Sequence, residues 1–157
     1  MKKKFRINQG IEIKIEKGVP AGFGMGSSAA SAAAAAVAFD KLFGLKLDDN
    51  SLVEFAGSGE KASAGSIHYD NVAASVLGGF VIVKTDPLYV IRIEPPTNLR
   101  MCIAVPEIIV PKKKTKVSRG VIPKKVNFSN SVLNLSNATA IVAGFMKKDL
   151  ELIGNSI

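Results

Sequence analysis

Three glycines at alternate positions, Gly22, Gly24 and Gly26, precede a serine pair and a long run of alanines. Glycine allows positive φ angles and lets the backbone approach a ligand without a side chain in the way. The first turn of a following helix would add unpaired N–H groups and the positive end of the helix dipole. The spacing therefore predicts an anion site, suited to phosphate, over residues 22–28.

Two common nucleotide motifs do not fit this loop. A P-loop needs a lysine directly after its last glycine, and here Ser27 follows Gly26. The dinucleotide fingerprint fails as well, because the glycines have a strict period of two and no acidic residue closes a βαβ unit. A glycine-rich turn that merely joins a strand to a helix stays open as an alternative, although the serine pair favours a phosphate site.

Four further residues have side chains that could carry chemistry. The Ser28 hydroxyl could reach a metal on the phosphates, and Glu60 offers a carboxylate to the same hard cation, such as Mg²⁺. Arg119 has a planar fork suited to a carboxylate, and His68 is the only histidine, in a polar segment. Each also has an ordinary structural interpretation: helix cap, exposed helix residue, solvated cation or hydrogen-bonding residue. Taken singly, these residues leave both interpretations open.

The elements around the loop follow from the residue pattern. Alternation of apolar and charged residues predicts strands at 5–7 and 11–16. The alanine run predicts a helix over 28–43 that its neighbours can approach closely, with Gly44 ending it. The loop is therefore expected between a strand and a helix.

Further elements are predicted along the rest of the chain. A second helix begins near the capping residues 48–51 and carries Glu60, with glycines interrupting it or loosening its end. A short helix over 72–76 is expected to be capped by Asp70 or a neighbour. Three β-rich runs predict an antiparallel sheet, at 80–84, 89–93 and 100–105. After these come an extended, mobile basic segment to residue 116, a short helix at 117–121, an amphipathic helix over 131–146 and another at 149–153.

Composition limits the class of protein. The chain has 157 residues, of which 47% are hydrophobic and 22% charged, which predicts a folded domain with a core. The single Cys102 excludes a disulfide framework and a cysteine metal site, fits a reducing cytosol, and is expected to be buried. There is no secretory signal, and the longest apolar run is too short to cross a bilayer. A soluble, cytoplasmic protein is expected.

The net charge of +8 would allow an anionic partner. However, the lysines are scattered, and aromatic residues do not alternate with them as a stacking platform for nucleic acid would require. Solvated basic faces are the simpler interpretation, so neither a nucleic acid nor a membrane is expected as a partner.

Together the candidate residues resemble a known family. The segment Pro20-Ala21-Gly22-Phe23-Gly24-Met25-Gly26-Ser27-Ser28-Ala29 is similar to the second motif of the GHMP kinases, Pro-x-Gly-x-Gly-Leu-Gly-Ser-Ser-Ala, with Met25 in place of leucine. Among these kinases the homoserine kinases are the most similar. That similarity lies in the segments Gly59–Ala62, His68–Ala73, Leu77–Phe80 and Thr115–Arg119.

The resemblance implies a site as well as a function. It implies ATP and Mg²⁺ as cofactors and phosphorylation of L-homoserine, a step of threonine biosynthesis. Ser28 and Glu60 would hold Mg²⁺ and, with Asn71, form the catalytic set; His68, Asn71 and Arg119 would face the amino acid. Asn71 would orient the acceptor hydroxyl, since an amide cannot act as a general base. The nucleotide phosphates would lie on Pro20, Gly22, Gly24, Met25, Gly26, Ser27, Ser28 and Ala29.

The resemblance also implies a fold. The expected class is α+β, with an N-terminal, ATP-binding GHMP domain like domain 2 of ribosomal protein S5 at residues 1–95, incomplete at its start. Residues 96–157 would begin a ferredoxin-like C-terminal domain that is truncated, because the family's first and third motifs are missing. A homodimer is suggested by the family alone.

Three alternative functions stay open. Another GHMP kinase would phosphorylate shikimate or mevalonate instead of homoserine. A non-catalytic binding module, including one that binds RNA, would use the same fold without the chemistry. A truncated and inactive remnant of a kinase would keep parts of the site only.

Overall fold

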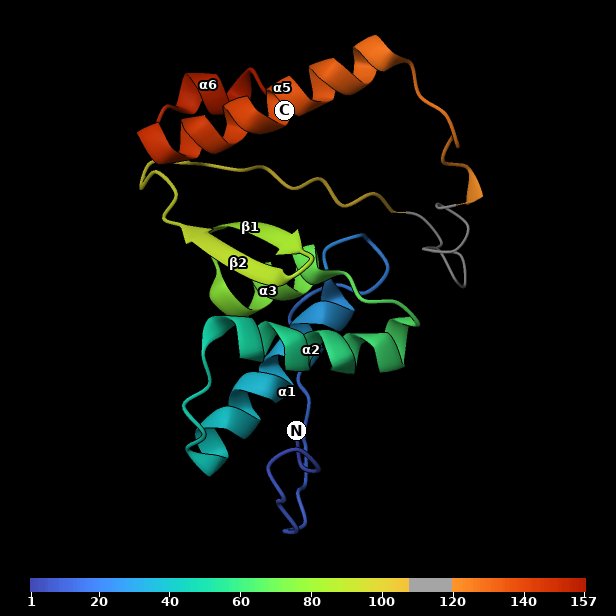
Figure 1. The fold of residues 1–157 in the computed structure, drawn as a ribbon, viewed down its shortest axis with the longest axis vertical. Coiled ribbons are helices and arrows are strands. Elements are labelled where there is room, and N and C mark those ends of the chain that lie inside the picture. Colours follow the sequence, from blue (N-terminus) through green and yellow to red (C-terminus); the bar gives the residue numbers. More distant parts are fainter. Residues whose placement is uncertain (108–119) are drawn as a thin grey trace. The chain divides into compact units, whose positions relative to one another are not determined.

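A computed structural model describes residues 1–107 and 120–157 of the chain (Figure 1). These residues form two compact units, Met1–Arg92 and Ile93–Ile157. The first unit contains the predicted phosphate loop.

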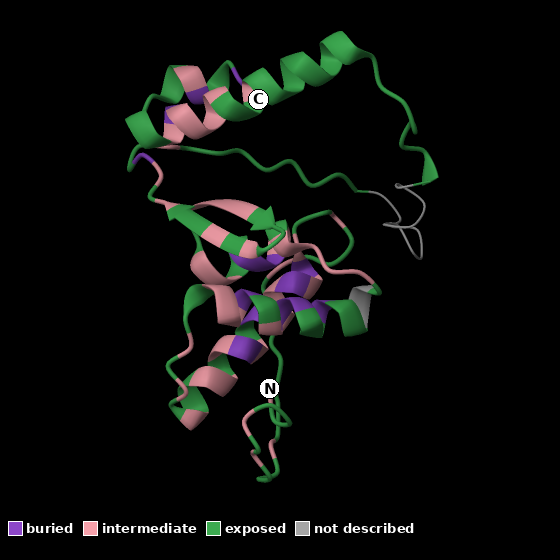
Figure 2. Ribbon diagram, in the orientation of Figure 1, coloured by how far each residue is buried: buried purple, intermediate pink, exposed green. Residues whose placement is uncertain are grey.

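Three helices form the centre of the first unit (Figure 1). They are α1 (Ser27–Phe43), α2 (Asp49–Ala64) and α3 (Tyr69–Leu77), and each packs against the other two. Alanine side chains allow the close approach of α1 that the sequence predicted. The core of this unit, purple in Figure 2, consists of Ala29, Ala33, Ala36, Val53, Ala56, Val72 and Ala73.

A β-hairpin lies against α3. Its strands are β1 (Phe80–Thr85) and β2 (Leu88–Ile93), and the two-residue turn between them makes the pair antiparallel. Apolar side chains from both strands pack against the helical core, namely Val81, Val83, Leu88 and Val90. The hairpin thus covers α3, the helix that begins at the candidate site.

The predicted ends of the first two helices are confirmed. Gly44 follows α1 with φ 59°, and the Asp48 side chain caps α2 by accepting a hydrogen bond of 2.7 Å from the Ser51 N–H. However, α2 is continuous through Gly57 and Gly59, so an interruption at these two glycines is wrong, whereas Gly65 ends the helix as its C-cap with φ 79°. Gly57 is buried, and Tyr69 and Ile67 pack where a side chain at this position would lie. The lack of a side chain therefore makes room for these two residues.

The Asp48 cap gives α2 a pH-dependent stability. The hydrogen bond from the Ser51 N–H holds the pKa of the Asp48 carboxyl below its usual value. The stabilisation is therefore complete above the ordinary carboxyl pKa and is lost as the pH falls through the lowered pKa of the folded state. We expect Asp48→Asn, which keeps an acceptor oxygen that does not titrate, to flatten the acid limb of thermal unfolding measured between about pH 5 and 2. An unchanged acid limb in this variant would contradict the prediction, and Asp49→Asn on the same helix is its control.

Three predicted strands are wrong. Segments 5–7, 11–16 and 100–105 are neither strand nor helix, and the described part of the chain holds only the two-stranded sheet of β1 and β2. Alternation identifies a strand only where a neighbour supplies ladder hydrogen bonds. Here Ile13 and Ile15 are 65% and 57% exposed. Cys102 is also exposed rather than buried, because the strand expected to bury it does not form.

Helix α5 (Phe128–Lys147) and the short helix α6 (Leu150–Gly154) pack together in the second unit. Both helices were predicted, although α5 begins three residues earlier, where the Asn127 side chain caps it through the Ser129 N–H. A Cβ on Gly144 would lie 2.8 Å from Ile153 Cγ1, so glycine permits this contact. The predicted basic segment and the helix at 117–121 lie almost entirely outside the described residues.

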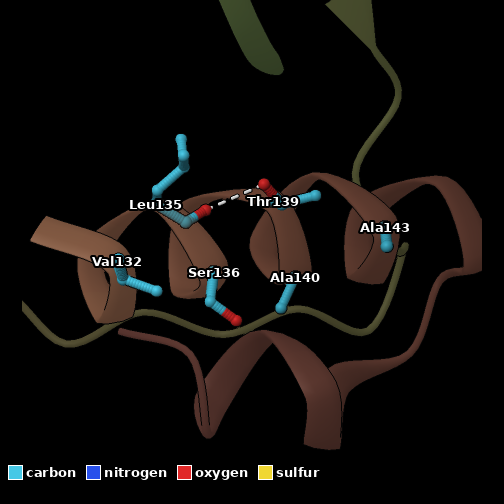
Figure 3. A pocket seen from close by; sticks show the side chains of 6 residues that line it. All are labelled: Val132, Leu135, Ser136, Thr139, Ala140 and Ala143. Carbon is cyan, nitrogen blue, oxygen red and sulfur yellow. Dashed lines mark hydrogen bonds between the residues drawn. The ribbon is translucent and has the colours of Figure 1, made fainter. Parts of the chain in front are cut away.

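A shallow, mostly apolar hollow of about 490 Å³ runs along α5 (Figure 3). Its lining residues recur at helical spacing and occupy one face: Val132, Leu135, Ser136, Thr139, Ala140 and Ala143. The Thr139 hydroxyl donates to the Leu135 carbonyl at 2.8 Å, so it is satisfied by its own helix. None of the predicted site residues that the structure describes lines this hollow. Among the helices of the described ranges, none is long and apolar enough to span a bilayer.

Candidate active site

The glycine loop has the backbone geometry that its sequence predicted. Gly22, Gly24 and Gly26 have φ angles of 90°, 78° and 69°, all in the range that glycine adopts without strain. Gly26 is the N-cap of α1 and makes no side-chain cap. The first-turn N–H groups of α1 therefore have no capping side chain from this position, which leaves them suited to an anion.

Ser27 joins the two ends of the loop. Its buried hydroxyl donates to the Val19 carbonyl at 2.9 Å. The Lys17 ammonium donates to the Ser27 carbonyl at 3.4 Å and lies 3.3 Å from the hydroxyl oxygen. The start of α1 is thus fixed to the segment before the loop, and a cation lies beside the predicted phosphate site.

Glu60 is the most deeply buried charged residue of this site, with 2% of its surface exposed. Oε2 accepts a hydrogen bond of 2.8 Å from the His68 backbone N–H, and Oε1 lies 3.2 Å from Nδ1 of the same residue. The Ser28 hydroxyl donates to Oε1 at 3.4 Å, a long bond. The carboxylate therefore connects the start of α1 with the segment that leads into α3.

Asn71, in the first turn of α3, lies beside the glycine loop. A Cβ built on Gly26 would be 3.4 Å from Asn71 Oδ1 and 3.6 Å from its Cβ and Cγ. These are ordinary contact distances, so glycine is favoured at position 26 by its φ of 69° rather than by lack of space. The expected cap by Asp70 or a neighbour is wrong: His68 is the N-cap of α3 without a side-chain cap, and Asp70 is an exposed residue of the first turn.

The Ser28 and Glu60 oxygens fit a divalent cation of the Mg²⁺ type. Mg²⁺ takes oxygen ligands at about 2.0–2.1 Å in an octahedron, which places adjacent ligand oxygens about 3 Å apart. Ser28 Oγ and Glu60 Oε1 are 3.4 Å apart, so a small shift would bring both onto one ion. Clusters of three or more His, Cys, Asp and Glu side chains do not occur in the described ranges.

The structure brings most of the predicted site residues together. Gly26 lies beside Asn71, and hydrogen bonds join Ser28 to Glu60 and Glu60 to His68. Pro20 and Met25 are exposed on the loop, and Ala29 is in the core. Arg119 was predicted to bind the substrate carboxylate, but it lies outside the described residues.

Sequence reasoning missed two polar residues of this region. Lys17 contacts Ser27, and the Ser66 hydroxyl lies 3.2 Å from His68 Nε2. Lys17 directly precedes Gly18 at the loop, and Ser66 lies two residues before the only histidine. These short separations were the available signals, but ordinary surface positions have them too.

Comparison with known proteins identifies the family. Residues 1–79 match the family described as "GHMP kinases N terminal domain". The chain therefore belongs to the GHMP kinases. This agrees with the glycine loop and with its position at the start of α1.

Several relatives of this chain within the family are homoserine kinases. The homoserine kinase of Thermoplasma volcanium is 40% identical over 153 residues, which cover 98% of this chain and 49% of the relative. That of Methanococcus maripaludis is 40% identical over 155 residues, 98% of this chain and 50% of the relative. A crystal structure of homoserine kinase from Cytophaga hutchinsonii matches with a TM-score of 0.85 and 38% identity, covering 99% of this chain and 49% of that one. The chain spans about half the length of these relatives.

Proposed function

We propose that this chain forms the nucleotide-binding and acceptor-orienting part of an enzyme that transfers the γ-phosphoryl group of ATP to L-homoserine. One observation carries the proposal: the glycine loop before α1, Glu60 of α2 and Asn71 of α3 come from three different elements and meet at one place. A glycine turn with only a structural role would not require the carboxylate and the amide beside it. The names of the relatives support homoserine as the acceptor.

The loop and Glu60 would bind the nucleotide. The backbone N–H groups at 22–28 would hold the phosphates at the positive end of α1. The Ser28 hydroxyl and the Glu60 carboxylate would hold Mg²⁺, which when bound neutralises phosphate charge. Lys17 adds a positive charge beside the loop. Positioning and charge neutralisation supply most of the catalysis of phosphoryl transfer.

Asn71 would orient the acceptor. The hydroxyl oxygen of homoserine would bond to the γ-phosphorus as the bond from that phosphorus to the β–γ bridging oxygen breaks, giving ADP, phosphohomoserine and a proton. The Asn71 amide accepts a hydrogen bond from the hydroxyl and so aims its lone pair, without removing the proton itself. Arg119 would bind the substrate carboxylate, and His68 would face the amino acid.

The domain layout is part of the proposal. Residues 1–95 would be the ATP-binding domain, of the ribosomal S5 domain 2 type, and residues 96–157 the beginning of the ferredoxin-like C-terminal domain. The division of the described chain between Arg92 and Ile93 supports this boundary. The second candidate function is a GHMP kinase whose acceptor is shikimate or mevalonate.

The test is ADP formation by the 157-residue chain with ATP, Mg²⁺ and L-homoserine, shikimate or mevalonate, together with ATP binding by calorimetry. We expect homoserine-dependent turnover, and a decrease of at least about tenfold in kcat/KM for Ser28→Ala, equivalent to about 1.4 kcal/mol of transition-state stabilisation. Ser58→Ala, an exposed serine of α2 bonded to the Glu54 carbonyl, is the matched control.

If only shikimate or mevalonate supports turnover, homoserine is not the acceptor, but the proposal of a kinase stands. Absence of ATP binding with and without Mg²⁺ would overturn the proposal. Equal turnover of the Ser28 and Ser58 variants would show that Ser28 has no role in the site.

A further inference from the structure

His68 forms a hydrogen-bonded row with two other side chains. Its Nδ1 lies 3.2 Å from Glu60 Oε1, and its Nε2 lies 3.2 Å from the Ser66 hydroxyl. The ring is 15% exposed and the glutamate side chain 2%. Both ring nitrogens thus have protein partners, at one end a buried carboxylate and at the other a hydroxyl.

The carboxylate fixes which nitrogen carries the proton in the neutral ring. An ionised carboxylate only accepts hydrogen bonds, so Nδ1 must donate to it. Nε2 of the neutral ring then has a lone pair, which accepts a hydrogen bond from the Ser66 hydroxyl. The row therefore runs in one direction, from the Ser66 hydroxyl through the imidazole to Glu60.

We propose that His68 is a positioning residue for Glu60, and that Ser66 holds its ring in place. The Nδ1–H and the backbone N–H of His68 bind different oxygens of one carboxylate, which fixes the rotation of the carboxylate plane. The oxygen that receives the Nδ1–H also receives the Ser28 hydroxyl. The part of the proposal that concerns Mg²⁺ rests on the proposed function.

This role differs from direct contact with the amino acid, the role expected from the family resemblance. A histidine that served only the substrate would not need a buried carboxylate as its partner. A partner that orients a metal-binding group changes metal affinity even though it does not touch the metal, by about 10–100-fold when removed. If His68 positions Glu60, loss of its ring should weaken Mg²⁺-dependent nucleotide binding. If His68 contacts only the amino acid, loss of its ring should change only the KM for homoserine.

The first test needs no ligand. Since the chain has a single histidine, its ¹⁵N spectrum contains one imidazole, and the tautomer can be assigned directly. In a spectrum that shows the ring in its neutral form, we expect the Nδ1–H tautomer to predominate. Glu60→Gln should increase the Nε2–H fraction, because the amide can donate to Nδ1. A wild-type ring with its proton on Nε2 would overturn the proposal.

The second test measures ADP binding by calorimetry with and without MgCl₂. We expect His68→Ala to weaken Mg²⁺-dependent ADP binding about tenfold and leave Mg²⁺-free binding unchanged, which also shows that the fold is intact. His68→Asn places an amide donor near the position of Nδ1 and should retain affinity within about threefold, whereas His68→Gln places it near Nε2 and should not. Ser66→Ala should give a smaller loss than His68→Ala.

Other outcomes separate this proposal from the kinase function. If His68→Ala changes only the KM for homoserine, the ring serves the substrate and the proposal is wrong. If wild-type ADP binding is insensitive to Mg²⁺, the metal-positioning role is wrong whatever the tautomer. If neither ADP nor ATP binds, the proposed function fails, whereas an Nδ1–H ring would still support the link to Glu60.

Discussion

Replacing Glu60 with alanine will abolish the Mg²⁺-dependent part of ATP binding and lower the free energy of unfolding by about 2–3 kcal/mol. The stability loss arises because the His68 N–H, its ring and the Ser28 hydroxyl all lose one acceptor in a buried region. A buried donor left without a partner costs about 1–3 kcal/mol. Calorimetry with ATP and urea unfolding measure the two effects separately.

Two variants control this experiment. Glu54→Ala removes an exposed carboxylate from the same helix and should leave both quantities nearly unchanged. Glu60→Gln keeps a carbonyl acceptor for the His68 N–H, so it should unfold closer to wild type while still losing most of its Mg²⁺-dependent affinity. If Glu60→Ala binds ATP and Mg²⁺ as wild type does, Glu60 is not a metal ligand.

Gly57→Ala is expected to destabilise the first unit by about 1–3 kcal/mol, the usual cost of overpacking a core. A Cβ at this position would lie 2.9 Å from Tyr69 Cε1 and 3.0 Å from Ile67 Cγ2. These two residues flank His68, so their displacement should also loosen the bond between His68 and Glu60. Urea unfolding gives the stability, and calorimetry gives the accompanying loss of Mg²⁺-dependent ADP affinity.

Gly59→Ala is the matched control for Gly57→Ala. It lies in the same helix, and its Cβ would make an ordinary contact of 3.4 Å with the Ala32 side chain. Alanine is favoured over glycine in a helix interior by about 1 kcal/mol, so this variant should be as stable as wild type or more stable. Equal stability losses in the two variants would show that contact with Tyr69 and Ile67 does not explain the effect of Gly57→Ala.

Local sequence signals predicted the helices better than the strands. Gly44 and Asp48 act on their own helix ends, so their effect can be derived from neighbouring residues. Segments 11–16 and 100–105 have strand-like patterns, but a ladder requires a second segment at the right distance, which no local pattern provides. The same reason explains why Cys102 was wrongly expected to be buried.

The individual residues of the candidate site could mostly be predicted from the sequence, but the hydrogen bonds between them could not. The glycines of the loop follow from the backbone freedom that only glycine offers, and Glu60 from the carboxylate that suits a hard cation, whereas the role of Asn71 came from the family resemblance. The bond between His68 and Glu60 could not be predicted, because it depends on how the segment between α2 and α3 folds back. Ser66 and Lys17 are common polar residues whose roles arise only from that geometry.

The hydrogen bond from Ser27 to the Val19 carbonyl closes the glycine loop into a ring. A closed ring tolerates changes in the identity of its outward side chains, such as the exposed Met25, but not changes in the number of its residues. An inserted or deleted residue would break the Ser27 bond or pull the first turn of α1 away from Glu60. The position of the first turn of α1 therefore depends on the length of this loop more than on its composition.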